Sequence, residues 1–252
     1  MEILYNDIIR TWRDRKAEDL LNRFFVKFTY SSNKIANIET RLRDVESIFS
    51  EERVSGFNGD TITLKEIENH KNLCKNIFKL SKENNGKLSI NLIKRFHFEL
   101  MKGCYLEELL SKGEKPGEFK IDCNVGSLQG AVDIEENLDL LIKEINEVEI
   151  NEDNVLKVVS YFHCCWWLGK VHLFACGNGR VGRMLLNYLL IGNNFPPIIV
   201  FYTDKEEYYL ALEYFNTKNE ISRMVEFLEV QSYKTWEKDY NVKLKCLKDF
   251  LD

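Results

Sequence analysis

The chain has 252 residues, of which 44% are hydrophobic and 30% are charged, and its formal net charge is −5. This length and composition predict one folded domain with a substantial core and argue against intrinsic disorder. Because the net charge is negative, the chain has no overall positive field that would attract nucleic acid or anionic lipid. This argues against nucleic-acid binding or membrane binding through general electrostatic attraction.

The sequence carries no pattern typical of export or membrane insertion. The first residues, MEILYNDIIRTWRDRKAEDLL, lack a basic stretch followed by an apolar run, so we expect no signal peptide. The most apolar segments are too short to cross a bilayer, or are broken by Asn, Gly and a Pro pair. The seven cysteines are irregularly spaced and are interpreted as reduced thiols. We therefore expect a cytoplasmic protein.

Helical spacing of apolar residues dominates the chain. Only three prolines occur, which leaves long stretches free to be helical. Apolar residues recur three and four positions apart, which predicts helices. The predicted helices are residues 5–28, 31–48, 64–83, 88–110, 134–147, 152–170, 180–193, 205–217 and 220–250. Asp60 and Asn151 stand where they can cap the helices that follow them.

One segment breaks the helical pattern. In PGEFKIDCNVGSLQGAV, residues 116–132, apolar and polar residues alternate between Pro-Gly and Gly-Ser boundaries. This alternation predicts a β-hairpin over 117–132. The predicted fold class is therefore all-α with a small β-hairpin, which is marginal by itself and needs a reason to exist.

The segment VHLFACGNGRVGRMLLNYLL, residues 171–190, places a glycine-rich loop before a predicted helix. Gly177, Asn178 and Gly179 allow backbone N–H groups to approach a ligand at the helix N-terminus, which favours anions. Arg180 and Arg183 share one helix face. Their charges oppose the helix dipole unless a bound anion such as a polyphosphate offsets them.

Three interpretations of this segment follow from its residues. His172 could take a proton from an attacking hydroxyl, which with the anion site predicts phosphoryl or nucleotidyl transfer. Alternatively, the loop only caps a core helix, and surface arginines pair with acidic neighbours. The third interpretation is a zinc site with ligands from His163, Cys164, Cys165, His172 and Cys176. Cysteines at this spacing are more commonly buried thiols than zinc ligands.

Residues 172–183 closely resemble the signature of the Fic family, His-Pro-Phe-x-Asp/Glu-Gly-Asn-Gly-Arg-x-x-Arg. YSSNKIAN, residues 30–37, is similar to the Ser-x-x-x-Glu-Gly/Asn motif of the family's inhibitory helix. EIENHKNL and GEFKID also fall where such proteins carry a helix and the start of a flap, so the resemblance covers about residues 20–230. It implies a single Fic domain over 1–252, mostly helical, with the predicted hairpin as the flap.

The resemblance implies transfer of AMP from ATP, with Mg²⁺, to a Tyr, Thr or Ser hydroxyl of a target protein, itself included. His172 would be the general base, Phe174 would anchor the loop, and the flap would align the target by strand pairing. The residues that the resemblance assigns to phosphates are Gly177, Asn178 and Gly179 for the α- and β-phosphates, Arg180 for the β-phosphate and Arg183 for the γ-phosphate.

This chain departs from the family pattern at three positions. Leu173 replaces proline, which changes only the stiffness of the loop. Cys176 replaces the acidic Mg²⁺ ligand, and a neutral thiol is a poor substitute, although phosphate oxygens and water could still hold the metal. Ala36 replaces the inhibitory glutamate, which in the family pairs with the arginine that is Arg183 here. Ser32 and Ala36 therefore mark a regulatory-type helix that should not inhibit this chain.

Two alternatives to this activity stay open. The chain is a nucleotide-binding protein with weak or no transfer activity if Cys176 prevents catalysis. It is a related transferase if it moves another nucleotide monophosphate, phosphocholine or phosphate. Tyr208 and Tyr209 line the adenine pocket by their position in the family or pack in the core, whereas Trp166 and Trp167 are expected to pack in the core and at its flank.

Overall fold

The computed structural model describes residues 2–14, 18–50, 60–121, 131–167 and 173–240. Regular structure in these ranges is helical. The elements are α1 (Glu2–Asp14), α2 (Glu18–Ala36), α3 (Leu42–Phe49), α4 (Thr61–Glu83), α5 (Ile90–Met101), α6 (Glu107–Ser111), α7 (Ala131–Glu147), α8 (Val155–Trp167), α9 (Asn178–Gly192), the 3₁₀ helix η1 (Tyr202–Asp204), α10 (Lys205–Lys218) and α11 (Ser222–Tyr240).

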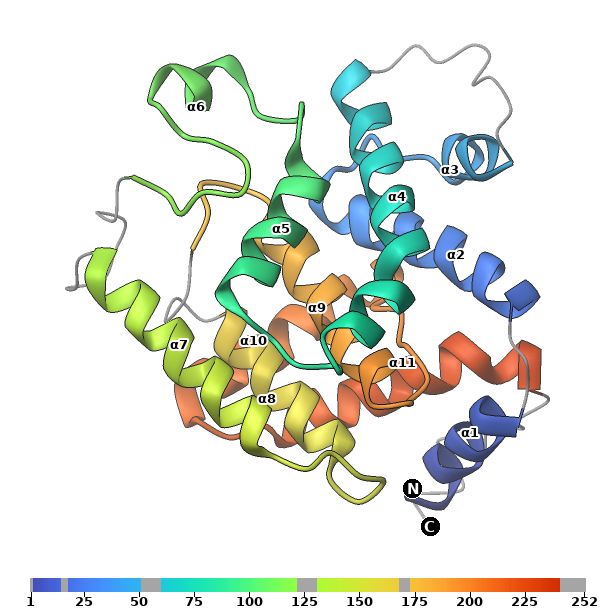
Figure 1. Ribbon diagram of the computed structural model, residues 1–252. Helices are drawn as coiled ribbons and strands as arrows, with labels where there is room; N and C mark the ends of the chain where they lie inside the picture. Colours follow the sequence, from blue (N-terminus) through green and yellow to red (C-terminus); the bar gives the residue numbers. More distant parts are fainter. Residues whose placement is uncertain (1, 15–17, 51–59, 122–130, 168–172, 241–252) are drawn as a thin grey trace.

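Helix α9 lies at the centre of the molecule, with α4, α5 and α8 packed around it (Figure 1). Every residue from Arg180 to Ile191 is buried. A helix buried on all sides is typical of a core position. Close packing depends on Gly182, because a Cβ there would lie 2.4 Å from Cδ1 of Trp166 on α8. The first turn of α9 is therefore fixed from several directions.

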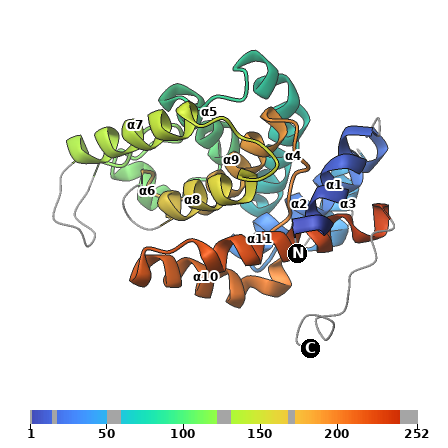
Figure 2. The ribbon, with the colours of Figure 1, turned by 90° about the horizontal axis from the view of Figure 1, so that it is seen from below.

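The remaining helices cover this centre in layers. Figure 2 shows α8 between α7 on one side and α10 with α11 on the other. Helix α1 packs against α11, where the rings of Trp12 and Trp236 lie 5.7 Å apart. Phe24 of α2 stacks on the same Trp236 ring at 5.6 Å. Aromatic contacts thus join the beginning of the described chain to α11.

The predicted boundary between helices 5–28 and 31–48 is wrong. Helix α2 runs through this boundary to Ala36, and the chain breaks instead between α2 and α3. Polar residues near this predicted boundary are buried: Thr29 Oγ1 lies 2.9 Å from His70 Nδ1 of α4. Residues 31–36 are thus the C-terminal end of a helix rather than the start of another.

The predicted helix 88–110 is wrong in its second half. Helix α5 ends at Met101, and Gly103 then adopts a left-handed backbone conformation with φ +72°. Such a conformation favours glycine and ends a helix. The other helices begin or end within a few residues of their predicted bounds, as far as the described residues extend. Asp60 caps α4 by accepting the N–H of Ile62 at 3.0 Å, as predicted.

The predicted β-hairpin over 117–132 is not seen in the described part of its range. Residues 117–121 form no strand, and residues 122–130 lie outside the described residues. Its last two residues are wrong, because Ala131 and Val132 open helix α7. One backbone bond joins this segment to the loop before α9, since the N–H of Lys120 donates to the carbonyl of Leu173 at 2.8 Å.

Candidate phosphate-binding site at the start of helix α9

The loop before α9 has a shape that its own residues enforce. Gly177 has φ +79°, and a Cβ there would lie 2.6 Å from Sδ of Met101, so the position requires glycine. The side chain of Asn178 closes the loop: its Oδ1 accepts the N–H of Phe174 at 3.1 Å, and its Nδ2 donates to the same residue's carbonyl at 2.8 Å. Among the described residues, no side chain caps α9. Its first N–H groups therefore remain available to an anion.

Arg183 lies one turn into α9 and is 1% exposed. Its Nε donates to Ser32 Oγ at 3.1 Å, and its Nη2 donates to the Ser32 carbonyl at 2.8 Å. Its Nη1 makes no hydrogen bond of good geometry within the described residues, although the Tyr208 phenol lies beside the guanidinium. Burial lowers the pKa of Arg183. An arginine this buried, held by a serine, is suited to receive a negatively charged ligand.

Arg180, at the very start of α9, is also buried, and it has a carboxylate partner. Its Nη1 lies 2.5 Å from Oε1 of Glu66 on α4. The other oxygen of Glu66 accepts from Nδ2 of Asn37 at 3.0 Å, and Asn37 also donates to Thr63 Oγ1 at 3.0 Å. Nε of Arg180 has no hydrogen-bond partner in the described part of the chain. Residues of α4 and the end of α2 thus hold this guanidinium.

The two arginines therefore form a buried cationic cluster beside an uncapped helix N-terminus. Each is held at one edge, and each keeps an N–H without a hydrogen bond among the described residues. A buried donor without a partner carries a free-energy penalty that an anion would remove. The interpretation as surface arginines is wrong, because both side chains are buried, although Arg180 does pair with an acidic residue.

His97 of α5 joins the loop to the segment after α6. Its ring stacks in parallel on Phe174, with 3.7 Å between centroids. The N–H of Gly117 donates to Nδ1 at 2.8 Å, which assigns the proton to Nε2, 3.0 Å from the Cys176 carbonyl. Burial lowers the pKa of His97 to about 4, so the imidazole is neutral near pH 7. This one side chain fixes two backbone segments.

Cys176 is half-buried in the loop. Burial raises the pKa of its thiol, against the opposing effect of Arg180, so the group is protonated near pH 7. Mg²⁺ prefers oxygen ligands, and a protonated thiol is not one. The side chain at position 176 is therefore not a suitable ligand for Mg²⁺.

Several other residues singled out from the sequence are placed by the structure. His172 lies outside the described residues, and Ala36 is exposed at the end of α2, one turn beyond Ser32. Tyr208 is buried with its hydroxyl 2.7 Å from His163 Nε2, and Tyr209 is 37% exposed. Trp166, Cys164 and Cys165 are buried in the core and Trp167 is partly buried against it.

No role at this site was predicted for Glu66 and Asn37, which hold Arg180, or for His97, which holds the loop. Asn37 and Glu66 lie in the quoted segments YSSNKIAN and EIENHKNL, but only as part of the resemblance. Glu66 comes from a helix 114 positions before Arg180 in the chain. No spacing within the helix distinguishes it from the exposed Glu68 beside it, because the pairing exists only in the folded chain. His97 gave no signal for the same reason.

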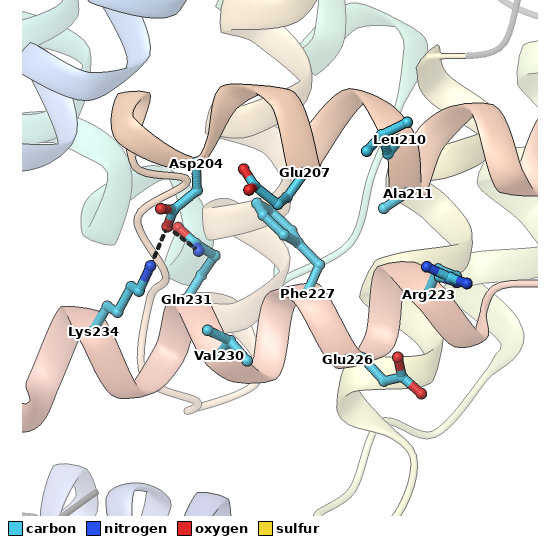
Figure 3. A pocket seen from close by; sticks show the side chains of 10 residues that line it. All are labelled: Asp204, Glu207, Leu210, Ala211, Arg223, Glu226, Phe227, Val230, Gln231 and Lys234. Atoms are coloured by element: carbon cyan, nitrogen blue, oxygen red, sulfur yellow. Dashed lines mark hydrogen bonds and ion pairs between the residues drawn. The ribbon is translucent and has the colours of Figure 1, made fainter. Parts of the chain in front are cut away.

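A surface pocket of about 340 Å³ lies elsewhere, between α10 and α11 (Figure 3). Its Asp204 carboxylate accepts from Lys234 and from Gln231, each at 2.6 Å. These polar groups already satisfy one another, and none belongs to the arginine cluster. The start of α9 is therefore the stronger candidate site.

No described helix is both long enough and apolar enough to cross a membrane.

Comparison with known proteins yields a family match that includes the loop before α9 and most of α9. Residues 87–190 match the Fic/DOC family. A segment of 49 residues, 19% of the chain, is 43% identical to the protein adenylyltransferase Fic of Nematostella vectensis, of which it covers 11%. A segment of 85 residues, 33% of the chain, is 33% identical to the protein adenylyltransferase Fic of Drosophila mojavensis, of which it covers 17%. The matched stretches thus span under a fifth of these relatives.

The fold is similar over nearly the whole chain. The crystal structure of a Fic-domain-containing signaling protein from Bacteroides thetaiotaomicron superposes with a TM-score of 0.78, covering 95% of each chain at 18% identity. This likeness shows a shared fold, including the helices outside residues 87–190.

Proposed function

We propose, from the premise that residues 87–190 form a Fic/DOC domain, that this chain is a protein adenylyltransferase. It moves AMP from ATP to a Tyr, Thr or Ser hydroxyl of a target protein, and to itself. The observation that carries the proposal is the pair of buried arginines at the uncapped start of α9, each with an unsatisfied N–H. A triphosphate supplies further negative charge to a cluster in which two arginines have one carboxylate partner.

We carry the roles of these residues over from the resemblance to the family signature, and the geometry of the loop supports them. Backbone N–H groups of Gly177, Asn178 and Gly179 bind the α- and β-phosphates, since the Asn178 side chain is already engaged with Phe174. Arg180 binds the β-phosphate and Arg183 the γ-phosphate, through donors that the protein leaves unpaired.

In the transfer itself, the target hydroxyl oxygen attacks the α-phosphorus. The bond between the α-phosphorus and the oxygen that bridges it to the β-phosphate breaks. Pyrophosphate leaves, and His172 takes the hydroxyl proton as general base. No step is assigned to Mg²⁺, because position 176 offers it no oxygen ligand. The nucleotide's own phosphate oxygens, with water, are the ligands that remain for the metal.

Mass spectrometry of the purified chain after incubation with ATP tests the proposal. We expect a mass increase of one AMP on the protein. His172→Ala should abolish this increase while ATP binding stays nearly intact, because the base contacts the hydroxyl and not the phosphates; a general base typically contributes roughly 10²–10⁴-fold. Full modification of the His172→Ala protein would contradict the assigned role.

The protonated thiol of Cys176 favours a second candidate function, nucleotide binding without transfer. Labelled ATP separates the two functions. Label that stays on the denatured protein indicates transfer, whereas label that binds but is lost on denaturation indicates a binding protein. Replacement of labelled ATP by other labelled nucleotides tests the related transferase activities in the same assay.

A further inference from the structure

Glu66 already holds one edge of the Arg180 guanidinium. Its carboxylate ion-pairs with Arg180 at 2.5 Å, and its side chain is 8% exposed, as is that of Arg180. Solvent screens such a pair only weakly. A ligand phosphate that binds Arg180 must therefore share the guanidinium with an internal carboxylate or displace it.

The protein holds Glu66 in this position from a second side. Asn37 donates to its other oxygen at 3.0 Å, and Asn37 is itself anchored to Thr63. Arg183, by contrast, donates to the hydroxyl and the carbonyl oxygen of Ser32, neither of which carries a charge. Of these two arginines, Arg180 alone has its charge offset by a described partner, so one carboxylate sets the net charge of the cluster.

We propose that Glu66 is a specificity-determining residue of the phosphate site, which lowers the affinity for polyphosphates by competing for Arg180. This inference rests on the proposed function, since it concerns the ligand of that same site. The competition acts on charge, so it weakens binding more for a nucleotide with more phosphate charges. Adenosine, which has no phosphate, should not be affected.

The test is Glu66→Gln, which keeps an oxygen acceptor for Arg180 but removes the negative charge. Calorimetry with metal-free ATP, ADP, AMP and adenosine measures the effect. We expect ATP affinity to rise about tenfold, with a smaller gain for ADP, a smaller one still for AMP and none for adenosine. The matched control is Glu68→Gln on the same helix, where the carboxylate is exposed and paired with Lys65 at 3.3 Å. This control should leave all four affinities unchanged.

A double variant tests whether the effect passes through Arg180. In an Arg180→Gln background the gain from Glu66→Gln should disappear, since no guanidinium is left for the carboxylate to occupy. A gain of the same size in that background would overturn the proposed competition. Asn37→Ala supplies a second route if Glu66→Gln fails to fold, because it loosens Glu66 without changing a charge and should raise ATP affinity less.

Failure of this inference and failure of the proposed function give different results. If the unaltered chain binds ATP but Glu66→Gln and Asn37→Ala bind it equally well or more weakly, Glu66 does not compete and the inference is wrong. If the unaltered chain and all variants bind no ATP, the phosphate site itself is wrong, and the proposed function falls with the inference.

Discussion

The side chain at position 176 determines whether the loop offers Mg²⁺ an oxygen ligand. Burial keeps the Cys176 thiol protonated, although a guanidinium lies close enough to favour its charged form. We expect Cys176→Asp to increase transfer at limiting Mg²⁺, because a carboxylate is the kind of ligand that the ion prefers. The measurement is the initial rate against Mg²⁺ concentration for both proteins. Superimposable curves would mean that residue 176 does not approach the metal.

His97 is a second single residue on which the structure of the loop depends, because it binds two backbone segments. His97→Phe keeps an aromatic ring against Phe174 but leaves the Gly117 N–H and the Cys176 carbonyl without their partner. Each buried group left unsatisfied costs about 1–3 kcal/mol, so the free energy of unfolding should fall by that order. Denaturant unfolding measures this loss.

The same His97→Phe protein tests whether His97 positions the loop. Transfer should fall more than ATP affinity does, because the arginines are held independently by α2 and α4. Equal losses of rate and of affinity would instead indicate general damage to the fold.

At the scale of elements, the end of α2 contacts the start of α9. Ser32 binds Arg183, and Ala36 is exposed one turn later. We expect Ala36→Glu to weaken ATP binding roughly tenfold, about 1.4 kcal/mol, because a carboxylate there competes with the γ-phosphate for Arg183. AMP binding should change less, since AMP lacks that phosphate. Calorimetry with both nucleotides gives the comparison.

Ile38→Glu is the matched control for this variant. It adds the same charge two positions later, at a side chain that is 59% exposed beyond the end of the helix. Its ATP affinity should match that of the unaltered chain. Similar weakening by both substitutions would attribute the effect to overall charge rather than to the helix α2.

At the scale of the whole molecule, buried histidines link stability to pH. Burial lowers the pKa of His97 to about 4 and those of His70 and His163 to about 3, from 6.5. Below pH 6.5 the unfolded chain therefore binds protons that the native protein does not bind. The contribution of these histidines to the free energy of unfolding should be constant above pH 7 and fall below 6.5, by up to about 1.4 kcal/mol per pH unit for each histidine.

Urea unfolding at a series of pH values between about 7.5 and 5 checks this expectation. His97→Phe should show a shallower decline than the unaltered chain, because one proton-binding site is absent from its unfolded state. A free energy of unfolding that stays flat to pH 5 would mean that these histidines are not buried in neutral form.

The sequence predicted features of the chain that depend on neighbouring residues and missed those that depend on packing. The apolar spacing located the helices, and Asp60 was correctly identified as a cap. The predicted break between residues 28 and 31 is absent, because α2 continues through it and the side chains of Thr29 and Ser32 find partners across the core. The turn at Gly103 was missed, since a single glycine within apolar spacing does not by itself end a helix.

The residues of the candidate site also fall into two groups, those predictable from local sequence and those that depend on packing. The motif residues Gly177 to Arg183 are close in sequence, so their shared position at a helix start could be predicted from spacing. Glu66 reaches Arg180, and Asn37 reaches Glu66, only because α4 and the end of α2 pack against α9. Their role depends on long-range contacts, which periodicity within one segment does not contain.

The bonds of Asn178 to Phe174 have a thermodynamic consequence for whatever anion the loop receives. Because one side chain already holds both backbone groups of Phe174, the loop loses its conformational entropy when the protein folds and not when the ligand arrives. Binding to a preorganised loop avoids that ordering cost. Association should then be limited by diffusion and by desolvation of the arginines, rather than by a slow rearrangement of the loop.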